Sequence, residues 1–188
     1  MSNNNLFRLA GWSGYLSAIA TIIGAVTLVI FFSIGDPFGK INDVCSVVIG
    51  LTAIVILFAL YQLHRSAAPT ISLIVFFVGA LAMLTAAVVQ TLLVINGTNF
   101  GMIVTIAFGI FGVSLIGFGF LTLVNQTLPR GLAWLGIAAG IGYVLVITGF
   151  ILNGENHPLT YLGGALAVIA YPAWAIWLGR VFLKSNQA

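Results

Sequence analysis

The sequence predicts an all-α protein, a single domain over residues 1–188 that forms a polytopic transmembrane bundle of six helices. Hydrophobic residues make up 61% of the chain and charged residues only 5%, against about 25% charged in soluble domains. The apolar residues also recur in long runs, each sufficient to cross a hydrocarbon core of about 30 Å. Such a chain cannot cover a water-facing surface, so a bilayer is its expected solvent.

Six apolar runs are predicted as the helices. In chain order they cover residues 9–34, 41–63, 71–95, 100–124, 132–152 and 159–183. The segments between them contain Gly or Pro together with Asn, Asp or Ser, a composition typical of turns. The first run is longer than the apolar core of a signal peptide, which has about 7 to 15 residues, so we expect it to remain as the first helix.

Asn42 and Asp43 stand at the start of the second run. At the beginning of a helix, a side-chain oxygen can cap free amide groups, and a negative charge meets the positive end of the helix dipole. We expect both residues to act in this way.

Small residues mark the helix faces on which close packing is expected. Gly136 and Gly140 form a G-x-x-x-G pattern in the fifth run, and Gly109, Gly112 and Gly117 thin the fourth. Packing within the chain is the expected use of these residues. Homodimerisation through one of these faces is the alternative.

Pro172 lies inside the sixth run. It removes a backbone hydrogen bond and crowds the carbonyl of Val168, which predicts a kink between the two residues. Such a kink serves packing alone or acts as a hinge in a transport cycle.

The positively charged residues predict the orientation, because translocation leaves Lys and Arg preferentially in the cytoplasm. One side of the six-helix zigzag holds Arg8, Arg65, Arg130, Arg180 and Lys184. The other side holds Lys40 and all three acidic residues. Both termini are therefore predicted to be cytoplasmic.

Two segments carry a resemblance. Arg8-Leu-Ala-Gly-Trp12 opens the first run, and Leu128-Pro-Arg-Gly-Leu-Ala-Trp-Leu-Gly136 leads into the fifth. Together they resemble an uncharacterised group of bacterial six-helix inner-membrane proteins. The resemblance implies a multi-pass protein of the bacterial plasma membrane and no catalytic residues.

No set of residues in the sequence strongly indicates a catalytic site, so we expect the protein not to be an enzyme. Gly11-Trp-Ser-Gly14 fits the pattern around the nucleophile of rhomboid-like proteases, but Ser13 lies in the first run and its nearest same-side histidine, His64, ends the second. A haem would need histidines at matching depths, whereas His64 and His157 fall on opposite sides. No cofactor is therefore expected.

One polar group remains as a weak candidate for a cation site. Asp36, Asp43, Glu155 and His157 all fall on the outer side, and hard cations take oxygen ligands. Solvated loops are the alternative interpretation.

The middle of the predicted bundle carries no ionisable side chain, although ion-coupled transport normally needs one there. The deepest polar residues are neutral: Thr52, Thr85, Gln90, Thr105, Ser114 and Thr148. We expect Ser and Thr at such positions to bond the carbonyl four residues earlier and to serve packing.

The sequence leaves two functions open. The first is a non-enzymatic accessory or scaffold subunit that acts through helix packing. The second is a carrier or channel for a small neutral or apolar molecule, which a continuous cavity lined by Thr105, Ser114, Tyr143 and Tyr171 would favour. The expected partners are membrane lipid and either another membrane protein or a second copy of the chain. Scattered Lys and Arg make no patch for nucleic acid.

Overall fold

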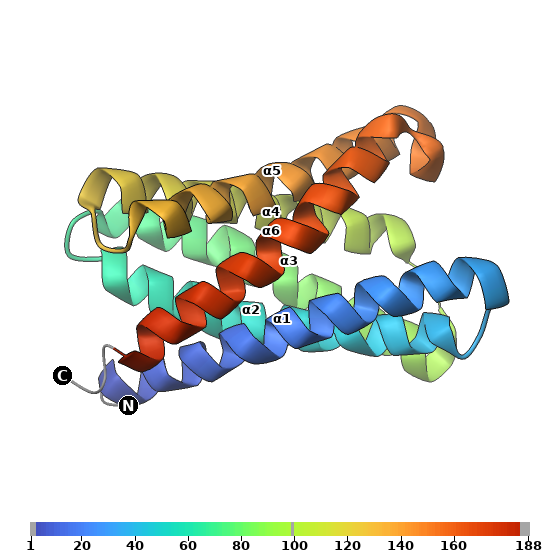
Figure 1. Ribbon diagram of the computed structural model, residues 1–188, viewed down its shortest axis with the longest axis horizontal. Helices are drawn as coiled ribbons and strands as arrows, with labels where there is room; N and C mark the ends of the chain where they lie inside the picture. Colours follow the sequence, from blue (N-terminus) through green and yellow to red (C-terminus); the bar gives the residue numbers. More distant parts are fainter. Residues whose placement is uncertain (1–2, 99, 185–188) are drawn as a thin grey trace.

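The computed structural model describes residues 3–98 and 100–184, except for the side chains of Asn3 and Glu155. This part of the chain forms six long helices and one short 3₁₀ turn (Figure 1). The elements are α1 Asn3–Ile34, α2 Phe38–His64, α3 Pro69–Asn96, α4 Gly101–Asn125, α5 Arg130–Asn153, η1 Gly154–Asn156 and α6 Pro158–Lys184.

All six helices are long and apolar enough to cross a membrane. The predicted all-α, six-helix class is thereby confirmed, and the protein is a multi-pass membrane protein. Asn99, in the predicted turn before α4, lies outside the described residues.

The helices extend past most ends of the predicted runs. Pro69 and Pro158, which the sequence placed in turns, are the first residues of α3 and α6. Proline suits this position because the first amide of a helix has no intrahelical partner to lose. α1 begins at Asn3, six residues before the predicted start at Leu9, because polar residues can continue a helix beyond its apolar span.

The predicted cap of α2 is wrong. The helix begins at Phe38, which places Asn42 and Asp43 in its second turn, and no side chain caps its start. Asp43 instead joins α2 to α3, since its Oδ1 accepts a hydrogen bond of 3.3 Å from Gln90 Nε2. Local sequence could not reveal this contact between two helices.

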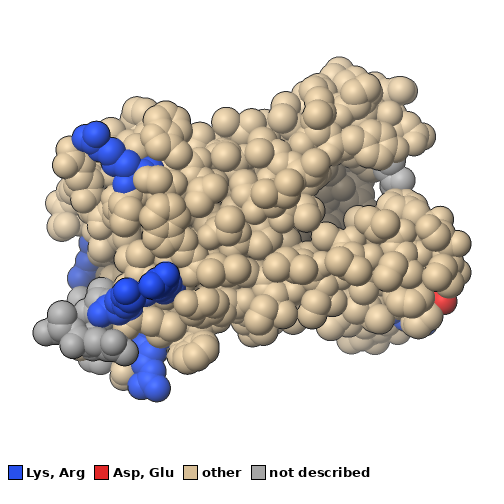
Figure 2. Space-filling model, in the orientation of Figure 1, with Lys and Arg blue, Asp and Glu red and all other residues tan. Residues whose placement is uncertain are grey.

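The six helices form a ring. Each packs on its neighbours in the chain, and α1 packs on α6 to close the circle. We call the end where α1 begins and α6 finishes the terminal end, and the opposite end the far end. Blue Lys and Arg side chains gather at the terminal end, as Figure 2 shows.

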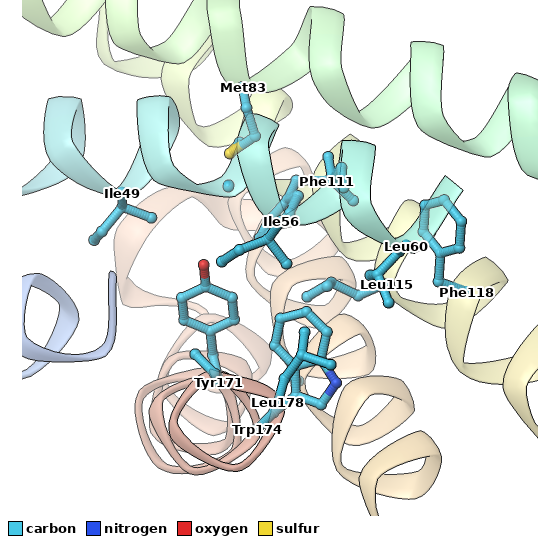
Figure 3. Packing of buried hydrophobic residues seen from close by; sticks show 14 of the residues in the cluster. Ile49, Ile56, Leu60, Met83, Phe111, Leu115, Phe118, Tyr171, Trp174 and Leu178 are labelled. Carbon is cyan, nitrogen blue, oxygen red and sulfur yellow. The ribbon is translucent and has the colours of Figure 1, made fainter. Parts of the chain in front are cut away.

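Large apolar side chains fill the ring on the terminal side. Ile56 and Leu60 project inward from α2, and Tyr171 and Trp174 project toward them from α6 (Figure 3). All four side chains are at most 4% exposed. This half of the bundle is a solid core.

The hydroxyl groups predicted to bond carbonyls of their own helices do so. Thr52, Thr85, Thr105, Ser114 and Thr148 each donate to the carbonyl four residues earlier. These bonds satisfy the donors within their own helices, so the side chains add little polarity to the bundle.

Pro172 is buried inside α6, which continues as helix to Lys184. The predicted kink and its role as a hinge stay predictions.

Candidate functional site

α1 and α6 approach closely only in their terminal halves. A Cβ atom built on Gly14 would lie 2.6 Å from the carbonyl oxygen of Ala175, and one on Gly179 would lie 2.7 Å from that of Gly11. Small residues are therefore required where these backbones meet. Beyond this contact the two helices diverge toward the far end (Figure 1).

A polar contact between the two helices joins Ser17 to Tyr171. The hydroxyl oxygens lie 2.7 Å apart, and both side chains are fully buried. A hydrogen bond in such an environment holds α1 against α6 at the middle of the bundle.

A cavity of about 230 Å³ begins one helical turn beyond this contact. α1, α2, α4, α5 and α6 all contribute to its wall. Figure 2 shows the hollow between the two lobes at the far end, on the face where α1 and α6 lie in front. The cavity therefore opens on the side of the bundle.

Aromatic rings separate the cavity from the solid core. Phe108 and Tyr143 line the cavity and stack with their centroids 5.6 Å apart. Tyr143 also meets Tyr171 edge-on at 5.9 Å, and Phe111 meets Tyr171 at 5.7 Å. Edge-on and offset arrangements of this kind are the favoured aromatic geometries. The cavity thus has a floor and does not continue through the bundle.

The wall is chemically more apolar than its composition suggests. Thr21 and Thr105 line the cavity, but Thr21 donates to the Ser17 carbonyl at 2.8 Å and Thr105 to the Gly101 carbonyl at 3.0 Å. Asn42, Ser46 and Tyr143 also line it, and their side chains have no hydrogen-bond partner among the described residues. The uncommitted polar groups therefore lie on α2, near the far end, and at the Tyr143 hydroxyl on α5.

Two of the four residues whose presence in a continuous cavity would favour a carrier line this cavity. Thr105 and Tyr143 line the cavity, while Ser114 and Tyr171 lie outside it. Ser114 faces α3, where its Oγ would lie 2.7 Å from a Cβ on Gly79. Tyr171 lies beneath the floor because its ring fills the point where α1 and α6 meet.

Gly164 is one of the wall residues that the sequence analysis did not name. A Cβ built on it would meet nothing within 4 Å, in contrast to its neighbour Gly163, which packs against α5. Sequence shows two adjacent glycines with no difference between them. Only the divergence of α1 from α6 leaves one of them beside empty space.

The glycines predicted to mediate packing lie between helices of the same chain. Gly112 and Gly140 face one another across α4 and α5, and Gly109 faces Ile147 on α5. Gly136 lies against Trp174 and Gly117 against α3.

The candidate cation ligands make separate contacts. Asp43 binds Gln90, and His157 Nδ1 accepts from the amide of Leu159 at 3.2 Å. The side chain of Glu155 lies outside the described residues. Within the described part of the chain, no three His, Cys, Asp or Glu side chains lie close enough to hold a metal ion, Asp36 included. The cation site stays a prediction.

His64 occupies a second polar site, at the terminal end. It is fully buried, its Nε2 lies 3.2 Å from Thr122 Oγ1, and its ring lies 5.9 Å from that of Phe118. Its spacing from Leu57 and Leu60 places it on the inner face of α2, a signal that sequence reasoning left unused. These contacts tie α2 to α4.

Comparisons with protein-family models, curated proteins and solved structures found no match to this chain. Its function must therefore be argued from the cavity and the helices around it.

Proposed function

We propose that this protein is a non-enzymatic membrane carrier that binds a small apolar molecule in the cavity between α1 and α6. The single observation that supports this function is the cavity itself, about 230 Å³ with a largely apolar wall. Ligand sites are typically concave and apolar with a few placed polar groups, here Asn42 and Ser46.

The closed floor supports a carrier in preference to a channel. A channel needs a continuous path, whereas a carrier exposes its site to one side at a time. In the far half of the bundle the cavity lies open between α1 and α6, and the terminal half is packed. Opening the terminal half would require α1 and α6 to part at the Ser17 to Tyr171 contact, and Pro172 adjoins this point.

The alternative is an accessory or scaffold subunit that binds its partner through a glycine-bearing helix face. In this fold, Gly109, Gly112, Gly136 and Gly140 face neighbouring helices of their own chain. These glycines are therefore not exposed to a partner protein. This arrangement supports the carrier in preference to the accessory subunit.

We also propose that the protein lies in the bacterial plasma membrane with both termini in the cytoplasm. The Lys and Arg side chains at the terminal end support this orientation. Fusions of alkaline phosphatase and of a fluorescent protein to the carboxyl terminus test it. A fluorescent and phosphatase-inactive pair is expected, and an active phosphatase would overturn the orientation.

Purification of the tagged chain in a gentle detergent, followed by mass spectrometry of whatever accompanies it, tests the function. A small apolar molecule is expected, and Gly164→Leu should lower its occupancy by about tenfold, because the new side chain fills the cavity. Ala165→Leu is the matched control, since Ala165 is exposed on the adjacent position of α6. A stoichiometric protein partner without a small molecule would establish the accessory subunit instead.

A further inference from the structure

We propose that the ligand of this cavity is an acyl chain of a membrane amphiphile, which enters sideways between α1 and α6. This inference rests on the proposed function and names the class of its ligand. Four features of the described residues carry it.

The first feature is the position of the opening. Leu28 on α1 and Val168 on α6 both line the cavity, and they are 40% and 41% exposed. Both residues stand on membrane-spanning helices at the hollow that Figure 2 shows on the lateral face of the bundle. An opening bordered by such residues faces the hydrocarbon region of the bilayer, so a lipid chain can enter without crossing water.

The second feature is the chemistry of the deep wall. Ala25, Ile49, Val146 and Ala167 present only aliphatic groups. The hydroxyl groups of Thr21 and Thr105 already donate hydrogen bonds to carbonyls of their own helices. Against this aliphatic part of the wall, a polar ligand would leave its own hydrogen-bonding groups unsatisfied, at a cost that a methylene chain does not incur.

The third feature is the separation of polar from apolar wall. Asn42 and Ser46 lie in the second and third turns of α2, toward the far end, and Ile49 follows them one turn deeper. A ligand that fits this order has a polar head near the membrane surface and an apolar chain that passes the aliphatic wall toward the floor, where Tyr143 is a further polar side chain.

The fourth feature is the volume. Closed pockets that enclose a drug-sized ligand have about 300 to 1,000 Å³. A cavity of about 230 Å³ that opens on its side accommodates part of one chain while the rest stays in the bilayer. The stacked rings of Phe108 and Tyr143 would meet the end of that chain.

Photocrosslinking in reconstituted vesicles tests the inference. The full-length protein is reconstituted in phosphatidylcholine with a trace of one of two probes. One is a phospholipid with a diazirine at the end of one acyl chain, and the other is a free fatty acid with the same diazirine. Labelled peptides are then mapped by mass spectrometry.

We expect labels at Phe108 and Ala167 to exceed those at Leu81 by about fivefold at equal probe concentration. Leu81 is the reference because it is 61% exposed on α3 and meets lipid without a cavity. Enrichment with either probe supports an acyl chain, and the more efficient probe identifies its source as a bilayer lipid or a free fatty acid.

Gly164→Leu should reduce the cavity labels by about fivefold and leave the label at Leu81 unchanged, whereas Ala165→Leu should change neither. Ala25→Leu fills the cavity from the α1 wall and provides a second variant should Gly164→Leu fail to fold. Uniform labelling that no cavity variant alters would overturn the inference.

The two proposals can fail separately. If a compound without an acyl chain copurifies, is displaced by Gly164→Leu and the cavity labels stay at the level of Leu81, the carrier stands and the acyl-chain inference is wrong. If the labels stay at that level and nothing copurifies, both proposals are wrong.

Discussion

The hydroxyl groups of Ser17 on α1 and Tyr171 on α6 lie 2.7 Å apart, although 154 positions separate these residues in the chain. On the terminal side of this contact the two helices pack through small residues, and on the far side they part around the cavity. The pair therefore marks the boundary between the closed and the open half of the bundle.

Removal of either hydroxyl should destabilise the protein modestly. Ser17→Ala and Tyr171→Phe should each lower the free energy of unfolding by about 1 kcal/mol, because each leaves the other hydroxyl buried without its partner. The double variant should lose less than the sum, with a coupling of about 0.6 kcal/mol, typical of hydrogen bonds between membrane helices. Equilibrium unfolding in mixed micelles measures all four proteins, and strictly additive losses would disprove the coupling.

Glycine at position 112 should tolerate no side chain. A Cβ there would lie 2.6 Å from the Gly140 carbonyl oxygen, a backbone atom that cannot rotate away. Gly112→Ala should therefore cost about 1 to 3 kcal/mol through overpacking of α4 against α5. Gly164→Ala is the control, because its Cβ meets nothing within 4 Å. Thermal unfolding in detergent compares them, and equal midpoints would contradict this account.

The two histidines should differ in their effect on stability. His64→Ala removes a fully buried ring and its bond to Thr122, with an expected loss of about 2 to 4 kcal/mol. His157→Ala removes a partly exposed ring that bonds only the nearby Leu159 amide among the described residues, so we expect a loss of about 1 kcal/mol or less. The same unfolding assay separates them, and an equal or smaller loss for His64→Ala would be inconsistent with its burial.

The contact between α2 and α3 should depend on both of its partners. Gln90→Leu leaves the half-buried carboxyl group of Asp43 without its donor, at an expected cost of about 1 to 3 kcal/mol. Replacement of both residues by Leu should recover part of this loss, because neither polar group then remains unpaired. Asp36→Leu, at the α1 to α2 turn, serves as the control for loss of a carboxyl group. A double variant less stable than Gln90→Leu would argue against the contact.

The sequence predicted the helices well because their signal is local. An apolar run long enough to cross a bilayer predicts a helix whatever surrounds it, since every backbone polar group in lipid must be satisfied within the segment. The same locality explains the behaviour of Thr52 and Thr148, whose hydroxyls bond carbonyls of their own helix. Errors arose at helix ends, where the start of α2 at Phe38 moved Asn42 and Asp43 out of a capping position.

The candidate site was predicted only in part because it depends on how helices cross. Of the four residues named as a lining that would favour a carrier, Thr105 and Tyr143 line the cavity, while Ser114 and Tyr171 do not. All four residues lie inside the apolar runs. The local sequence does not show whether such a residue lines the cavity or lies beneath its floor. The sequence does not indicate that Gly164 lines the cavity, because this role depends on the empty space beside it in the folded bundle.

The sequence by itself determined that this protein has six membrane-spanning helices, where each lies in the chain, and which end of the bundle carries the positive charge. The tertiary structure alone decided that α1 closes the ring on α6, that the two meet through Gly14 and Gly179, and that they part beyond Ser17. The physical reason is that spanning a membrane is a property of each segment, whereas a cavity is a property of the angle between segments distant in sequence.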